Sequence, residues 1–249
     1  MFSQIIKDVG ELVLTIVFIY IVVVWLVRHR EYWAKQLKQQ RLLLLWVIML
    51  FVLLLKVSED VIALESGPVD KAVLIWIHAM VPNTFTGFFR AVTLSASAKV
   101  IFPLLGILTA LLFAVRWRFE ATVMLSSVMA NVLLIYLVKT LVGRERPMLW
   151  ETEWYWGSSF PSGHTLTSAT LATAICVCVA RRWLPAKWPA IMLSIIWVLL
   201  VALSRLVLGV HWPTDVLASA CAGVLIALVM DASLYIVRQR WKKYVSEHA

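Results

Sequence analysis

Three groups of polar residues lie between positions 139 and 215, each at the end of a long apolar run. Such residues are energetically expensive within a membrane, so this placement indicates a functional site rather than a solvated surface. Cations bind phosphate oxygens, and imidazole can act as acid, base or nucleophile, so the set predicts a phosphate site. Its members are Lys139, Arg144, Arg146, Ser162, Gly163, His164, Arg205, His211 and Asp215.

The first group is a cluster of cations after an apolar run. Gly143 lets the helix relax just beyond Lys139, Arg144 and Arg146 follow, and Pro147 ends the turn. A guanidinium binds phosphate through two parallel hydrogen bonds, whereas an ammonium acts as a mobile point charge. The alternative interpretation is that Lys139 and Arg146 extend to lipid headgroups, as cations at helix ends often do.

The second group, Phe160-Pro161-Ser162-Gly163-His164, directly precedes another apolar run. Ser162 and Gly163 would therefore lie at a helix amino terminus, where free N–H groups attract anions. The alternative is that Ser162 is a simple helix cap and Pro161 an ordinary helix starter. A purely structural role is harder to assign to His164, and it can donate a proton to a leaving oxygen near neutral pH.

The third group is Ser204-Arg205 followed by His211 and Asp215. If a helix begins after His211, the histidine and Asp215 are one turn apart on the same side. The carboxylate can then hold one imidazole nitrogen while the other attacks as a nucleophile. The alternative is an aspartate that caps a helix beside an interfacial histidine.

The composition excludes a soluble domain. Of the 249 residues, 62% are hydrophobic and 15% are charged, and the mean hydropathy is +0.87. Apolar runs near 20 residues long must be helices to satisfy their backbone in lipid. The net charge of +9 is distributed as a topological signal rather than as a nucleic-acid patch. Three cysteines, Cys176, Cys178 and Cys221, lie within apolar runs and are expected to be buried and free.

We therefore predict an all-α transmembrane bundle. The first run ends in Arg28-His29-Arg30 and lacks a small-residue cleavage site, which favours a retained span over a signal peptide. Residues 1–41 would form an extra N-terminal span and basic cytoplasmic loop, and residues 42–249 a second unit. The predicted spans are 11–27, 42–57, 100–115, 121–142, 164–180, 190–210 and 214–237.

Two further patterns place the site relative to the membrane. Polar breaks divide residues 58–98 into pieces too short to span, and Val73, Leu74, Ile77 and Met80 follow a helical period. This segment is predicted to form amphipathic helices on the outer surface. The loops on one side carry 14 of the 23 lysines and arginines, so the positive-inside rule puts the three polar groups on the non-cytoplasmic side.

The three groups together resemble the motifs of the type 2 phosphatidic acid phosphatase superfamily, membrane lipid phosphatases related to vanadium haloperoxidases and glucose-6-phosphatase. The first motif matches Lys139 to Arg146-Pro147, the second Pro161 to His164, and the third Ser204-Arg205 to His211 and Asp215. The resemblance extends from about Asp70 to Val237, and the first span lies outside the usual six-helix core.

The resemblance implies a phosphohistidine mechanism without a metal or other cofactor. His211 would attack phosphorus, Asp215 would orient it, and His164 would protonate the leaving group. The remaining residues would bind the phosphate oxygens: Lys139, Arg146, Ser162, Gly163 and Arg205. Arg144 and Glu145 fall within the variable gap of the first motif, which leaves their participation open.

The expected substrate is a membrane lipid phosphate or diphosphate within the bilayer, with undecaprenyl diphosphate and phosphatidylglycerol phosphate leading. The compact chain suggests a bacterial inner-membrane protein whose site faces the periplasm. The aromatic segment from Trp150 to Trp156 can form an interfacial belt or line the access path for the headgroup. Alternatives are a lipid phosphotransferase, such as one acting on lipid A, a vanadate-dependent peroxidase and a non-catalytic transporter. The sequence does not specify an oligomeric state.

Overall fold

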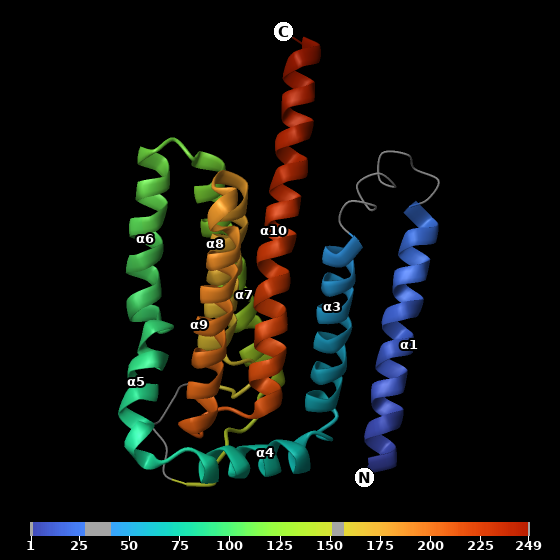
Figure 1. Ribbon diagram of the computed structural model, residues 1–249, viewed down its shortest axis with the longest axis vertical. Coiled ribbons are helices and arrows are strands. Elements are labelled where there is room, and N and C mark those ends of the chain that lie inside the picture. The colour runs from blue at the N-terminus through green and yellow to red at the C-terminus, as the bar shows by residue number, and fades with distance from the viewer. Residues whose placement is uncertain (1, 28–40, 151–156, 249) are drawn as a thin grey trace.

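The computed structural model describes residues 2–27, 41–150 and 157–248, and all regular secondary structure in these ranges is helical (Figure 1). The predicted all-α fold is confirmed. The helices are α1 (Phe2–Val27), α3 (Arg41–Ile62), α4 (Gly67–Met80), α5 (Thr86–Ser95), α6 (Ala98–Ala114), α7 (Arg118–Val142), α8 (Gly163–Arg182), α9 (Lys187–Val207) and α10 (Pro213–His248), with short 3-10 turns at Asn83–Phe85 and Leu184–Ala186.

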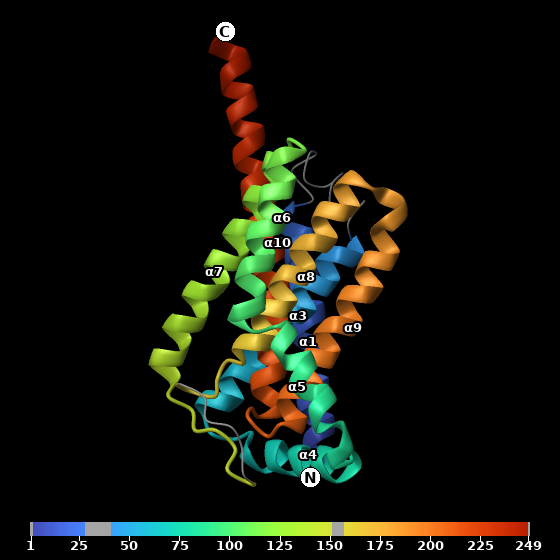
Figure 2. The same ribbon diagram turned by 90° about the vertical axis from the view of Figure 1, so that its left-hand side faces the viewer.

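Within the described ranges, six helices are long and apolar enough to cross a membrane: α1, α3, α7, α8, α9 and α10. The protein is therefore an integral membrane protein. The remaining predicted span appears as α6, whose 17 residues give about 25 Å at 1.5 Å per residue. Helix α5 turns 91° away from α4 and lies below α6 in both views (Figures 1 and 2). Helices α5 and α6 therefore extend in succession along the bundle: α6 matches the span predicted at 100–115, whereas α5 belongs to the segment predicted to lie on the outer surface.

Helix α4 lies across the end of the bundle (Figure 1). Its residues Leu74 and Ile77 are buried, while Lys71 and His78 are exposed. This confirms the predicted amphipathic helix, although Met80 of the predicted stripe is exposed. In contrast to α4, α5 follows the long axis of the bundle rather than lying across its end.

The polar groups and the basic connections lie at opposite ends of the molecule. The turn before α10 and the start of α8 are at the end covered by α4, whereas the α6–α7 and α8–α9 connections and the C-terminus are at the other end (Figure 1). Of the basic loop predicted at 28–41, residues 28–40 lie outside the described residues, and Arg41 begins α3. Helix α10 continues to His248, past the expected end at 237. Its last residues extend beyond the other helices of the bundle (Figure 1).

Helix α8 is the central helix, packed against α7, α9 and α10. A buried apolar cluster joins α6, α7, α8 and α10 through residues such as Leu105, Val128, Leu171 and Ala227. At Gly223 of α10, an added Cβ would lie 2.6 Å from the backbone oxygen of Leu166. Small residues permit this close helix approach. The packing holds the start of α8 beside the start of α10.

Candidate active site

A cavity of about 490 Å³ lies at the α4 end of the bundle, between α6, α7 and α8. It contains six of the eight residues that the sequence predicts for the site: Lys139, Arg146, Gly163, His164, Arg205 and His211. They come from α7, the segment after it, α8, α9 and the turn before α10. The fold therefore brings together parts of all three motifs around one space.

His211 lies in the turn between α9 and α10 and is only 2% exposed. Its Nδ1 is 3.5 Å from Oδ2 of Asp215, and its Nε2 is 3.3 Å from Nη1 of Arg146. The first distance is long for a hydrogen bond, but it places the carboxylate beside the ring. Burial lowers the pKa of His211 to about 4, opposed by Asp215. The ring is neutral at pH 7, the state in which it can act as a nucleophile.

Backbone and side-chain oxygens hold the three predicted cations in place. The ammonium of Lys139 donates to the carbonyl of Ser158. Arg146 donates to the carbonyl of Val210 at a distance of 2.8 Å and to the carbonyl of Ser158 at 3.4 Å. Arg205 is fully buried, and its Nη1 donates to Oγ1 of Thr93 over 2.6 Å. These three positive groups line one cavity, which favours binding of a multiply charged anion.

The second motif is divided between the cavity and the protein interior. Gly163 begins α8, and both Gly163 and His164 line the cavity. Ser162 is fully buried, its N–H donates to Oγ of Ser219 over 2.7 Å, and its hydroxyl is 3.1 Å from that of Thr165. Ser162 and Asp215 are therefore placed behind the cavity wall, and the phosphate-binding role of Ser162 stays a prediction.

Arg144 forms a buried network behind His211. Its guanidinium donates hydrogen bonds to Asp70 at a distance of 2.6 Å, to Asp215 at 2.5 Å and to Oγ1 of Thr214 at 2.8 Å. Asp70 in turn accepts from the N–H of Thr214 at 3.0 Å. The network joins α4, the segment after α7 and the start of α10, so it orients the carboxylate that faces His211.

Sequence reasoning did not find this role of Asp70 and left that of Arg144 open. A usable signal was present, because Asp70 precedes Leu74 by four residues and Ile77 by seven. It therefore falls on the apolar stripe of α4, where a charge needs a partner. Asp70 is indeed fully buried.

Trp150 covers the turn that carries His211. Gly209 has φ of +65°, and an added Cβ there would lie 2.5 Å from Nε1 of Trp150. The indole stacks on His78 of α4 with ring centroids 4.0 Å apart. The rest of the predicted aromatic segment, including Trp154 and Trp156, lies outside the described residues.

Comparison with known proteins identifies the family. The sequence profile of the PAP2 superfamily matches residues 120–242. The chain is 28% identical over 186 residues to phosphatidylglycerophosphatase B of Bacillus subtilis, covering 72% of this chain and 89% of that protein. The chain belongs to the PAP2 superfamily. The matched region contains all eight predicted site residues.

Two further relatives match this PAP2 chain over shorter stretches. Phosphatidylglycerophosphatase B of Escherichia coli K12 is 34% identical over 97 residues, covering 37% of each chain. The Haemophilus influenzae protein of the same name is 37% identical over 81 residues, covering 31% of this chain and 33% of that one. The match therefore spans about a third of the length of these two relatives.

Solved structures share the fold of this PAP2 protein. The crystal structure of a transmembrane PAP2 type phosphatidylglycerolphosphate phosphatase from B. subtilis superposes with a TM-score of 0.69 at 23% identity, covering 75% of this chain and 94% of that one. Aquifex aeolicus LpxE gives 0.53 at 23% identity, covering 64% and 92%. Family and relatives together identify the chain as a membrane lipid phosphatase. Helix α1 packs on α3 at the edge of the bundle, and the division of the chain at residue 41 stays a prediction.

Proposed function

We propose that this PAP2 phosphatase removes the terminal phosphate of phosphatidylglycerol phosphate or undecaprenyl diphosphate through a phosphohistidine intermediate at the periplasmic face of a bacterial inner membrane. The observation that carries the mechanism is the position of His211. The His211 ring is neutral at pH 7 and has Asp215 on its Nδ1 side. It lines a cavity that is also lined by three cations and a second histidine. An anion-binding pocket without chemistry has little need of an imidazole oriented in this way.

The reaction follows from the two histidines. Nε2 of His211 attacks phosphorus while Asp215 stabilises the positive ring, and the bond from phosphorus to the lipid oxygen breaks. His164 gives that oxygen its proton. A water molecule then attacks phosphorus, His164 takes the water's proton, and the bond to His211 breaks to release phosphate. Lys139, Arg146 and Arg205 neutralise the phosphoryl oxygens throughout, as cations do in phosphoryl transfer.

The walls of the cavity support a lipid substrate. Phe102 of α6 and Val132 and Ile135 of α7 form its apolar side. Phe102 is 49% exposed and Val132 is 36% exposed on the outer surface of the bundle, where lipid chains would lie. A headgroup can therefore enter the cavity while its tail remains in the bilayer between α6 and α7. The names of the relatives favour phosphatidylglycerol phosphate as the first substrate to assay.

The proposed orientation rests on the positive-inside rule. The end of the bundle opposite the cavity carries Arg116 and Arg118, Arg181 to Lys187, and the basic part of α10. Reporter fusions test this directly. An alkaline phosphatase fused after residue 249 is expected to be inactive and a green fluorescent protein fluorescent, and the reverse result would contradict a periplasmic site.

The mechanism is tested with purified protein, a panel of lipid phosphates and diphosphates, and radiolabelled substrate. We expect release of free phosphate, inhibition by orthovanadate, which mimics pentavalent phosphorus, and no effect of a metal chelator. An alkaline quench during turnover should trap label on the wild type and none on His211→Ala. Unlabelled wild-type enzyme under these conditions, or a strict magnesium requirement, would contradict the phosphohistidine scheme. Transfer of label to a second lipid instead of water would identify a phosphotransferase.

A further inference from the structure

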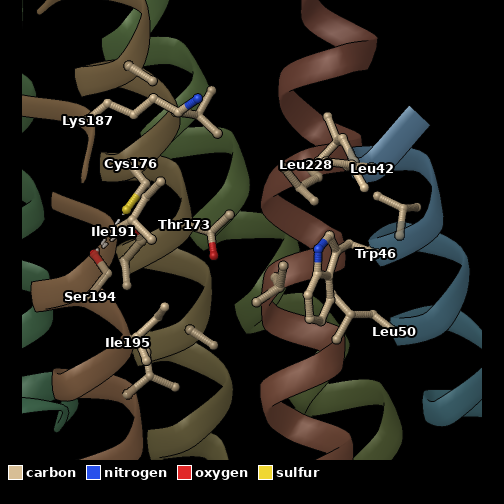
Figure 3. A pocket seen from close by; sticks show the side chains of 18 of the residues that line it. Leu42, Trp46, Leu50, Thr173, Cys176, Lys187, Ile191, Ser194, Ile195 and Leu228 are labelled. Carbon is tan, nitrogen blue, oxygen red and sulfur yellow. Dashed lines mark hydrogen bonds between the residues drawn. The ribbon is translucent and has the colours of Figure 1, made fainter. Parts of the chain in front are cut away.

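A second cavity of about 900 Å³ lies toward the end of the bundle opposite the active site. Helix α3 forms one wall with Leu42, Trp46 and Leu50, and α9 contributes Ile191 and Ile195 to the other (Figure 3). Helix α3 packs on α10 and α9 packs on α8, so the space between α3 and α9 is a groove with α8 and α10 as its floor. In the described part of the chain, no residue lines both this groove and the catalytic cavity.

The groove is chemically divided along its length. Most of its lining is aliphatic, and two cations, Arg41 and Lys187, lie where α3 and α9 begin. Polar side chains within the wall include Cys176 and Ser194, and the thiol of Cys176 donates a hydrogen bond of 3.1 Å to the hydroxyl of Ser194. Figure 3 shows Lys187 beyond Cys176 and Ile191, on the same side of the apolar stretch as Leu42, the neighbour of Arg41. An occupant must therefore be apolar over most of its length and negatively charged at one end.

We propose that this groove binds an anionic diacyl phospholipid, with its headgroup phosphate at Arg41 and Lys187 and its acyl chains between α3 and α9. The volume lies within the range of about 300–1,000 Å³ that is common for ligand cavities. Basic pockets between transmembrane helices are suited to anionic headgroups, and a bilayer supplies such lipids at high local concentration. The bound lipid fills the space that separates α3 from α9 and so stabilises the bundle. This inference does not depend on the proposed substrate or mechanism.

Native mass spectrometry of the delipidated full-length protein tests the proposal with phosphatidylglycerol, phosphatidylcholine and inorganic phosphate as probes. We expect wild type to retain phosphatidylglycerol in preference to phosphatidylcholine, with a rise in Tm, and inorganic phosphate to give no rise. Each of Arg41→Gln and Lys187→Gln should weaken phosphatidylglycerol binding about fivefold, the usual effect of one cation near a lipid surface. Thr173→Phe, which fills the middle of the groove (Figure 3), should weaken binding of both lipids.

Two matched controls separate the groove from other lipid contacts. The double variant Lys242→Gln/Lys243→Gln removes two exposed cations from α10 that do not line the groove, and it should bind as wild type does. Arg146→Ala disrupts the catalytic cavity and should also retain phosphatidylglycerol. Unchanged binding in the Arg41→Gln/Lys187→Gln variant, equal retention of the two lipids by wild type, or loss of binding in Arg146→Ala would each overturn the proposal. Normal hydrolysis of a short-chain substrate verifies that the groove variants are folded.

Discussion

Two ion-pair networks, each with a buried carboxylate paired to arginine, lie at opposite ends of this bundle. At the active-site end, Arg144 joins Asp70 at 2.6 Å to Asp215 at 2.5 Å. At the other end, Arg182 makes two 2.8 Å hydrogen bonds to Glu120. Both acceptor carboxylates, Asp215 and Glu120, are fully buried. Each network joins helices that are far apart in the sequence.

The networks differ in what their carboxylates touch. Asp215 lies 3.5 Å from the ring of His211, whereas the ion-pair partners described for Glu120 are Arg181 and Arg182 at the end of α8. Those arginines also stack over aromatic rings, Arg181 over Phe119 at 4.8 Å and Arg182 over Trp117 at 5.1 Å. A perturbation of the first network should therefore reach the reaction, and one of the second should change stability alone.

The largest effect is expected from His211, the proposed nucleophile beside the carboxylate of the first network. His211→Ala should reduce kcat by about 10⁴–10⁶-fold, the loss that follows removal of a covalent nucleophile. The fold should persist, measured as an unchanged elution profile in detergent and a Tm close to that of wild type. Turnover near the wild-type rate would remove His211 from the nucleophilic role.

Arg144→Gln should lower kcat by about 10²-fold, because a displaced Asp215 no longer orients the ring and small misplacements have effects of this size. KM should change little, since Arg144 does not line the catalytic cavity. Arg144→Lys keeps a charge near Asp215 and should recover part of the rate. If kcat stays at the wild-type value while Tm falls, Arg144 has only a structural role and the comparison fails.

Arg182→Gln is the matched change in the second network. It removes both hydrogen bonds from the buried Glu120 but leaves Arg181 3.8 Å away, so the expected loss of stability is about 1–3 kcal/mol, below that for a fully isolated buried charge. A thermal scan in detergent should show a lower Tm, with kcat within about twofold of wild type. Combining it with Glu120→Gln should restore part of the Tm, since the uncompensated charge is then gone. A large loss of kcat in the folded variant would show that the two ends are coupled.

The smallest effect is a shift in pH dependence. Burial holds the pKa of His211 at about 4, so the nucleophile is neutral above that pH and activity due to this group is lost as pH falls through about 4. Removing the positive charge of Arg144 should favour the protonated ring and move the acid limb of kcat/KM to higher pH. The pH profiles of wild type and Arg144→Gln are measured with the same substrate, so the ionisation of the substrate affects both profiles equally. The same limb in Arg182→Gln should stay at its wild-type position.

Much of the active site was accessible from local patterns. The sequence predicted that His211 and Asp215 lie close together if a helix begins just after His211, and α10 does begin at Pro213. Pro161-Ser162-Gly163-His164 predicted the start of α8, which begins at Gly163. The span predicted at 100–115 corresponds to α6, Ala98–Ala114, because the break at residues 96–97 separates the polar-interrupted segment that contains α5 from a continuous apolar run.

The sequence by itself determined the membrane class, the order of the helices and the candidate residues for binding and attacking phosphate, because these depend on the hydrophobic periodicity and on spacings within a turn or two. Only the tertiary structure decided which distant groups support them. Asp70 and Arg144 are 74 residues apart, and Thr93 and Arg205 are 112 apart. No local period encodes such pairs. They form because close packing of the helices brings each buried charge or donor within hydrogen-bond distance of partners from other parts of the chain.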